Sequence, residues 1–330
     1  MDMVTFTFLF SKRTVQLPIL IFSIGILFSC SAIRKAQHIN MDNTSCLPIK
    51  APVSIGLSTI KPIHELNIDT ALSSRFSFTS LNVANSIGIL EMLGQYVALN
   101  EKVKQSASFE NRLALLELSH NISKRISQAS LEVSSVTSEI DCEEEKIAQI
   151  ADYLSKKEQD KETKLTVVAI VVSAADAILS TLPKSVFNFE YMGLVSGITG
   201  TTIAILILKN QQKVVLKHNR NMLHEIWVGN EQSTMFPDFI WYYLNYYDPN
   251  KKNERSIRYQ IVERWMNFKQ IDNANAKKRK VLIDIYFGNG GEYSTDQLYN
   301  RANMYDQLES YIKLIKQELT LLAFEFENIK

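Results

Sequence analysis

Apolar residues recur at alternating steps of four and three along the middle of this chain. Nine such positions follow one another, interrupted only at Glu143: Ile122, Ile126, Ala129, Val133, Val136, Ile140, Ile147, Ile150 and Leu154. Heptads sustained over this length predict a long helix with a coiled-coil-like seam. We expect this helical segment to cover 81–164, with a break near Gly88 and Gly94, because glycine weakens a helix.

A second seam follows near the C-terminal end, with one irregular step of three between Tyr305 and Leu308. Its positions are Leu298, Ala302, Tyr305, Leu308, Ile312, Ile315, Leu319, Leu322 and Phe326. Ser294 or Thr295 can cap this helix. We expect the two seams to pack against each other as the core of a bundle; a homo-oligomeric coiled coil is the alternative.

Two apolar stretches of 18 residues, 165–182 and 191–208, are joined by an eight-residue connection. Eighteen residues give about 27 Å of helix, the lower limit for crossing a bilayer core. We therefore expect a hydrophobic helical hairpin over 165–208. It either enters lipid or is covered by protein.

Four residues inside this hairpin are candidates for its packing and function. Gly193 and Gly197 have the four-residue spacing that lets helices approach closely in lipid, and Gly200 follows them. Asp176 is the one charge in the first stretch. A carboxylate there could line an aqueous path, cap a helix after a break at Ser173, or face solvent.

The rest of the chain is less periodic. Residues 30–80 are rich in Ser, Asn, Thr and Pro, which predicts a tether followed by short extended structure, for example over 75–79. Residues 209–330 form a helical C-terminal region with an aromatic-rich subdomain. The aromatic run 236–249 is expected to be buried rather than to form a docking surface, and a helix is expected over 254–268.

The N-terminal residues 1–29 have the pattern of a signal peptide. Lys12 and Arg13 precede an apolar run that ends at Leu27-Phe28-Ser29-Cys30. This ending resembles the lipobox of bacterial lipoproteins, although Phe28 is larger than the residue usual there. The resemblance implies export, lipidation of Cys30 and cleavage before it; an uncleaved anchor helix with an incidental cysteine is the alternative.

The location implied by this resemblance is the bacterial cell envelope. The residues after Cys30, from Ser31 to Lys35, include no acidic side chain, which favours a periplasm-facing anchor. Cys46 and Cys142 remain after lipidation. They can pair in an oxidising periplasm, but the pairing cannot be deduced from the sequence.

A long helix, a hydrophobic hairpin and a helical return resemble the layout of α-helical pore-forming toxins of the cytolysin A and haemolysin BL type. The features that carry this resemblance are the heptads from Ile122 to Leu154, the apolar stretch 165–208 and a helical return from Lys209. It implies a membrane-inserting hairpin. The chain departs from the layout after Trp227, and no residue motif supports it.

Candidate chemistry does not converge on a site. His120, His218 and His224 lack the spacing of metal ligands, and we expect the first two to lie in helices. The Gly288–Gly291 stretch lacks the Lys and Ser/Thr of a phosphate loop and predicts a turn. The acidic run from Asp141 to Glu145 reads as a solvated helix face rather than a cation site. Lys277–Lys280 reads as an exposed basic turn, with headgroup or phosphate contact as the alternative.

The balance of 36 Lys and Arg against 35 Asp and Glu gives no basic field that would attract nucleic acid. We therefore expect a mainly α fold, an elongated helical bundle with a central hydrophobic hairpin. We expect a non-enzymatic, lipid-anchored envelope protein with no cofactor, no metal and no identifiable small-molecule substrate. Its partners are membrane lipid and a protein or a second copy of itself. The alternative function is a pore-former.

Overall fold

The structure of the chain is a computed structural model. It describes Cys46 and residues 60–106, 108–180, 211–218, 220–252, 254–271 and 275–329; for residues 168 and 171–180 only the backbone is described. The described residues are mainly helical, which confirms the expected fold class. Their only sheet has two strands.

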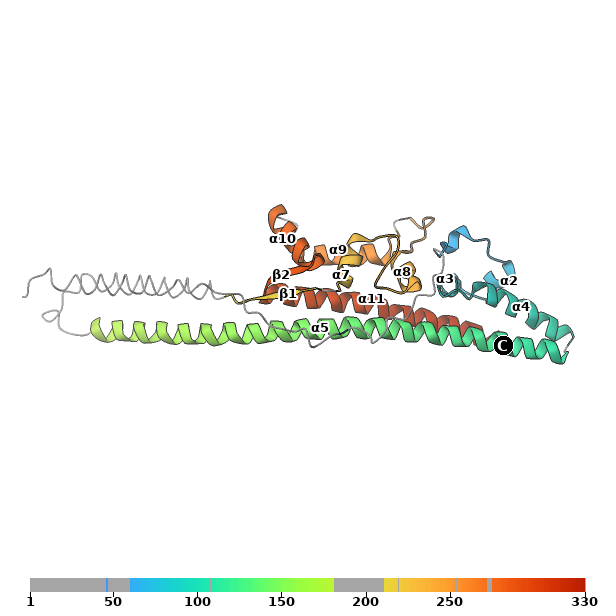
Figure 1. Ribbon diagram of the computed structural model, residues 1–330, viewed down its shortest axis with the longest axis horizontal. Helices are drawn as coiled ribbons and strands as arrows, with labels where there is room; N and C mark the ends of the chain where they lie inside the picture. The colour runs from blue at the N-terminus through green and yellow to red at the C-terminus, as the bar shows by residue number, and fades with distance from the viewer. Residues whose placement is uncertain are drawn as a thin grey trace, which may run out of the picture. The chain divides into compact units, whose positions relative to one another are not determined.

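The longest element is α5 (Phe109–Ser180), a helix of 72 residues (Figure 1), or about 108 Å at 1.5 Å per residue. Ser108 precedes its first turn, and its hydroxyl oxygen accepts a hydrogen bond from the backbone N–H of Asn111 at 3.1 Å. All nine predicted seam positions are buried. The helix continues through Ser173, so no helix begins after a break there.

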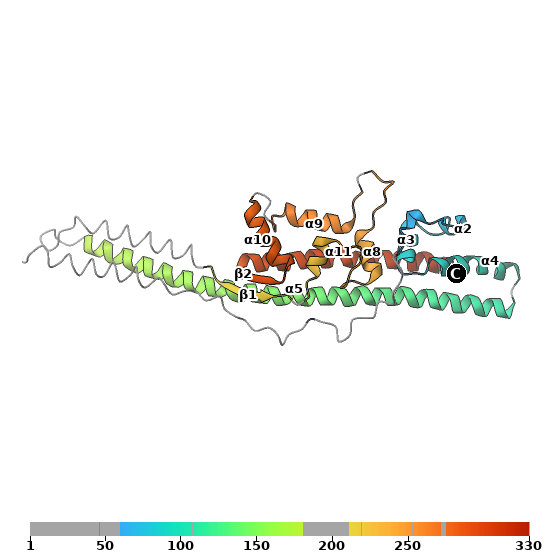
Figure 2. The same cartoon turned by 45° about the horizontal axis from the view of Figure 1, so that its top comes forward.

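The second seam belongs to α11 (Thr295–Glu327), and all nine of its predicted positions are buried. Ser294 caps the helix in a capping box with Gln297. α11 lies along α5 (Figure 2). The Tyr299 hydroxyl donates to Asp152 at 2.7 Å. Further along α11, Asp306 lies close enough to Glu144 for its negative charge to raise the pKa of that carboxyl. The helices are therefore antiparallel, and the seams form a bundle core within one chain.

The segment before α5 differs from the expectation. It contains η1 (Ile63–Glu65), α2 (Thr70–Ser73), α3 (Phe78–Ser86) and α4 (Leu90–Gln105). The extended structure expected over 75–79 is wrong, because Ser77 caps α3 and Phe78 begins it. Residues 60–80 are not a tether either, since Ile63, Leu72 and Phe76 are buried in the core.

The break predicted near Gly88 and Gly94 occurs at Gly88. Gly88 separates α3 from α4 with φ 75°, a left-handed conformation that glycine adopts without strain. Gly94 lies inside α4. A further break, around Ser106 and Ser108, separates α4 from α5 and was not predicted.

The helical return expected from Lys209 is wrong. The chain there forms β1 (Lys213–Lys217), which pairs antiparallel with β2 (Gly290–Ser294) in the register Val214 to Tyr293. The turn expected over Gly288–Gly291 is therefore shorter than predicted. Gly290 has φ 91°, and a Cβ atom there would overlap the carbonyl oxygen of Leu216.

Four short helices form an aromatic-rich layer over α11. They are α7 (Met222–Val228), α8 (Asp238–Asn245), α9 (Ile257–Asn267) and α10 (Ala276–Phe287). Phe287 stacks between Trp227, with ring centroids 4.5 Å apart, and Trp265, at 5.8 Å. Phe236, Phe239, Trp241 and Tyr243 are buried, so the expected burial of the aromatic run is confirmed, as is the helix predicted over 254–268.

Only part of the expected hairpin lies within the described residues. The backbone of 165–180 continues α5. Gly193, Gly197 and Gly200 lie outside the described residues, as does the side chain of Asp176. The candidate lipidation residue Cys30 also lies outside them.

Candidate functional site

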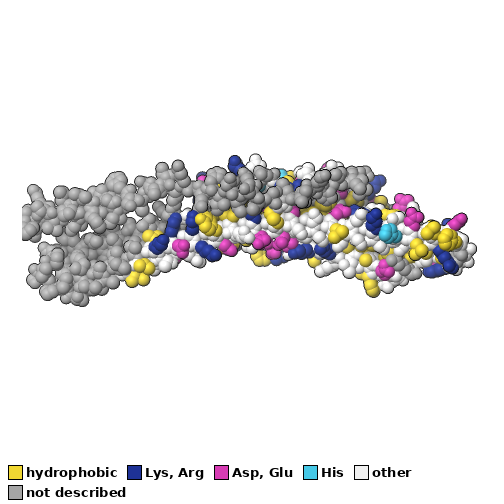
Figure 3. Space-filling model, turned by 60° about the horizontal axis from the view of Figure 1, so that its bottom comes forward, with side chains coloured by type: hydrophobic (Ala, Val, Ile, Leu, Met, Phe, Trp, Pro, Cys, Tyr) yellow, Lys and Arg dark blue, Asp and Glu magenta, His cyan; other side chains and the backbone are white. Residues whose placement is uncertain are grey.

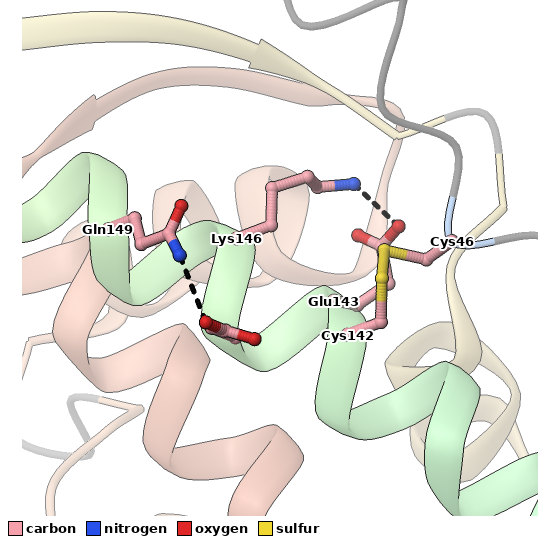
Figure 4. The surroundings of a disulfide bond; sticks show 6 residues. Cys46, Cys142, Glu143, Lys146 and Gln149 are labelled. Atoms are coloured by element: carbon pink, nitrogen blue, oxygen red, sulfur yellow. Dashed lines mark hydrogen bonds and ion pairs between the residues drawn. A yellow bond between two sulfur atoms is a disulfide. The ribbon is translucent and has the colours of Figure 1, made fainter.

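A disulfide fastens the N-terminal part of the chain to the middle of α5. Cys46 is bonded to Cys142, which lies 96 positions later in the sequence, with Cα atoms 5.7 Å apart. Figure 4 shows the bond on the outer side of α5. Cys142 is exposed there, two positions after the seam residue Ile140, so solvent and thiol reagents can reach the bond.

The helix surface around the disulfide is organised by pairs within α5. Glu143 bonds Lys146 at 2.5 Å, one helical turn away, and the Gln149 amide donates to Glu145 at 3.0 Å (Figure 4). Glu143 occupies the one polar position of the seam. Its carboxylate is tolerated there because Lys146 neutralises the negative charge.

The acidic run around Cys142 does not form a metal site. Within the described ranges no group of three or more His, Cys, Asp or Glu side chains is arranged to hold a metal ion. The pKa of Glu144 is raised by burial and then by the neighbouring carboxylates of Asp306 and Asp141. That shift favours the protonated form, which binds metal ions poorly.

The second candidate region is the continuation of α5 beyond the body of the protein, residues 165–180, which we call the apolar arm. The body contacts the base of this arm through Gln212. Its backbone N–H donates to Glu158 at 2.5 Å, and its side-chain oxygen accepts from Lys161 at 3.0 Å. Beyond this point Val167 and Ile170 are 53% and 63% exposed.

Val167 and Ile170 are three positions apart, so they lie on one face of α5, and other apolar side chains of this helix, such as Leu113 and Leu116, are exposed to a similar degree. Among the residues that the structure describes, none of the helices is both long enough and apolar enough to span a membrane.

His218 and His224 are bonded to other groups of the fold. His218 follows β1 and is not helical, contrary to the expectation, whereas His120 lies on α5 as expected. His218 Nε2 lies 2.7 Å from the Tyr293 hydroxyl, and Tyr293 donates to the carbonyl of Ile285. Because tyrosine has one hydroxyl proton, His218 is the donor in this pair. Burial, followed by the charges of Arg301 and Lys146, lowers the pKa of His218 to about 2.

The most extensive buried polar network was not predicted. It surrounds the C-terminus of α10, where helix carbonyls lack partners within the helix. Asn221 donates to the carbonyls of Tyr286 at 2.9 Å and Gly288 at 3.1 Å. His224 Nδ1 donates to Phe287 at 2.7 Å, and Arg301 donates to Tyr286 at 2.5 Å.

We call these three donors, Asn221, His224 and Arg301, the α10 clamp. Arg301 lies directly before the seam residue Ala302, and its four-residue spacing to Tyr305 is the only sequence signal that could have placed it in the core. The clamp joins α10 to α11 and to α7 with its preceding residue Asn221. Because its donors bond carbonyls at the end of α10, it stabilises the packing of these three helices.

Comparison of the chain with protein-family models, with curated proteins and with solved structures finds no match.

Proposed function

We propose that this chain is a non-enzymatic lipoprotein of the bacterial cell envelope, anchored through Cys30 on the periplasmic side. The observation that carries the proposal is the disulfide between Cys46 and Cys142. Disulfides form and persist in oxidising compartments such as the periplasm and are rare in the cytosol. The pairing uses two of the three cysteines and leaves Cys30, the residue of the lipobox, available for acylation.

The disulfide also limits how far α5 can stand from the membrane that holds the anchor. Sixteen residues separate Cys30 from Cys46, so the connection reaches at most about 55 Å. Thirty-eight residues of α5 lie between Cys142 and Ser180, which is about 57 Å of helix. The end of the apolar arm is therefore within reach of the bilayer that carries the lipid anchor.

In this proposal the protein acts by helix association, and the apolar arm is the part that meets a membrane or a protein partner. The exposed side chains of Val167 and Ile170 support this role, because burying them against lipid or protein is favourable at about 25 cal/mol per Å². The arm reaches its target after export, from the periplasmic side. Positively charged residues beside a membrane-spanning helix usually face the cytoplasm, but an arm that inserts after export does not follow this tendency. Lys161 and Lys164 at the base of the arm therefore do not indicate a cytoplasmic orientation.

The pore-forming alternative was suggested by the heptads, the apolar stretch and a helical return, and the helical return is absent from the residues described after the apolar stretch. The helical return is replaced by β1, which fixes the chain after the hairpin to β2. Dye release from liposomes on addition of acyl-free protein tests this alternative directly. A lipid-anchored protein that works by association releases no dye, whereas a pore-former does.

The experiment that tests the anchor is metabolic labelling with palmitate. Cys30→Ala should abolish the label and leave an unprocessed precursor. The double variant Cys46→Ala/Cys142→Ala is the matched control, because it removes the other two thiols and should keep the label. A mass spectrum that shows an unmodified Cys30, or Met1 still in place on the membrane-bound protein, would contradict the proposal.

A further inference from the structure

Three basic segments lie at the end of the body from which the apolar arm extends, and one of their residues, Lys213, pairs with Glu292 of β2 at 3.7 Å. The whole chain is nearly balanced, with 36 basic and 35 acidic residues. The segments 156–164, 213–217 and 276–280 together contain ten Lys and Arg but three Asp and Glu. We call these ten basic residues the basic collar: Lys156, Lys157, Lys161, Lys164, Lys213, Lys217, Lys277, Lys278, Arg279 and Lys280.

The three segments lie at one end of the body. Gln212, directly before β1, is bonded to Glu158 and Lys161 of α5, and β2 links β1 to α10. In Figures 1 and 2, β1 and α10 lie at the end of the body from which α5 extends as the arm. Figure 3 shows Lys and Arg side chains grouped where the described surface approaches the arm.

The first turn of α10 carries four of these charges in a position that disfavours them. Asn275 caps the helix, accepting from the backbone N–H groups of Lys277 at 3.0 Å and Lys278 at 3.1 Å. Cations are unfavourable at a helix N-terminus, where the helix dipole is positive. Over the described ranges, no salt bridge involves any residue from Lys277 to Lys280. The cluster thus costs stability within the fold, and an external anion would offset that cost.

We propose that the basic collar docks on an anionic lipid surface and holds the base of the apolar arm against it. The proposal rests on the membrane role proposed above and assigns its lipid chemistry. Basic residues just beyond an apolar segment bind acidic headgroups, and each contributes about fivefold in affinity near the surface. Lysine stems bury their methylene groups while the ammonium stays at the headgroups. The continuity of collar and arm favours a bilayer over a soluble anion as the occupant.

The proposal is tested first on the native protein. The full chain is purified from membranes and reconstituted into vesicles of phosphatidylcholine, with and without phosphatidylglycerol. Acetylation rates are then measured for Lys277, Lys278 and Lys280 by mass spectrometry, with Lys102 and Lys104 in the last turn of α4 as internal controls.

On anionic vesicles the collar lysines should react about fivefold more slowly than on neutral ones, while the control rates stay unchanged. The protection should disappear in about 1 M salt, where the Debye length falls to about 3 Å. Equal rates on both kinds of vesicle would overturn the proposal. The mass of the N-terminal peptide in the same samples reports acylation of Cys30, so failure of the anchor is seen separately.

Matched variants provide the second test. In acyl-free mature protein that begins at Cys30, Lys277→Gln/Lys278→Gln is compared with Lys102→Gln/Lys104→Gln for cosedimentation with phosphatidylglycerol vesicles. The collar pair should weaken binding by about tenfold or more, and the control pair should leave it unchanged. Removing cations from the first turn of α10 favours the helix, so reduced binding would not reflect unfolding. Equal effects of the two pairs, or none, would contradict the proposal.

Discussion

Arg301 Nη2 of α11 donates to Asn221 Oδ1 across 3.1 Å, and both side chains also donate to the carbonyl of Tyr286. Arg301 is 1% exposed. A guanidinium in this position acts as a cap for the C-terminus of α10, where helix carbonyls are partially negative. The α10 clamp therefore adds side-chain donors to a helix that ends at the C-cap residue Gly288, and it fixes α10 to α11.

Replacing Arg301 with Met should destabilise the protein by about 3 kcal/mol, because the carbonyl of Tyr286 and the side chain of Asn221 lose a buried donor. Chemical denaturation gives the free energy of unfolding. Arg255→Met is the control, since Arg255 forms an exposed pair with Glu263 at 3.3 Å that should contribute less than about 1 kcal/mol. Equal losses in the two variants would show that the clamp is not a stabilising centre.

The helical seam gives a second test. Val136 is 6% exposed, and Leu131, on the same helix, is 69% exposed. Val136→Asp buries an unpaired carboxylate between α5 and α11, which should cost several kcal/mol, whereas Leu131→Asp should change the free energy of unfolding by about 0.5 kcal/mol or less. Thermal melts of the two variants should differ clearly; matching melting temperatures would contradict the seam.

The disulfide should stabilise the fold and limit the distance between α5 and the membrane that holds the anchor. Cys46→Ser/Cys142→Ser opens a link across 96 residues and should cost about 2 to 4 kcal/mol. The variant should still be acylated at Cys30, but the membrane connection would then extend to Ile60, which packs against the core, and would reach about 100 Å. Energy transfer between a labelled lipid and a probe on α5 should fall. Unchanged transfer would indicate that the disulfide does not set the distance.

His218 predicts acid sensitivity. Its pKa is lowered from 6.5 to about 2 by burial and by the charges of Arg301 and Lys146. Below pH 6.5 the imidazole is therefore protonated in the unfolded chain but stays neutral in the folded chain. Its contribution is fully present above pH 6.5 and declines as the pH falls, by about 1.4 kcal/mol per unit.

Burial raises the pKa of the carboxyls of Glu139, Glu144 and Glu318. These groups therefore favour the folded state as the pH falls, which opposes the effect of His218. The test is therefore a comparison of stability against pH. His218→Gln keeps a donor for Tyr293 and should show a shallower loss below pH 6.5 than the wild-type protein. Parallel curves would show that His218 does not titrate as described.

Part of this structure could be read from local patterns. The two seams, their burial, the capping of α11 by Ser294 and the burial of the aromatic run are all determined by residue type and spacing. Periodicity of 3.5 residues specifies the helices and the face that each one buries, whereas the tertiary structure decided that the two seams pair within one chain. The same reasoning missed the break before α5, because Ser106 and Ser108 are compatible with a loop and with a helix.

Other features depend on residues that are distant in sequence. Cys46 meets Cys142 because the chain between them folds back along α5, and β1 forms only because β2 supplies its hydrogen-bonding partner 77 residues later. Arg301 is buried because Asn221 and Tyr286 present acceptors to it. The placement of the three basic segments at one end of the body depends in the same way on the packing of α5, β1 and α10. Local propensity determines where a helix can form, but a strand, a disulfide or a buried charge is stable only when tertiary packing brings its partner to it.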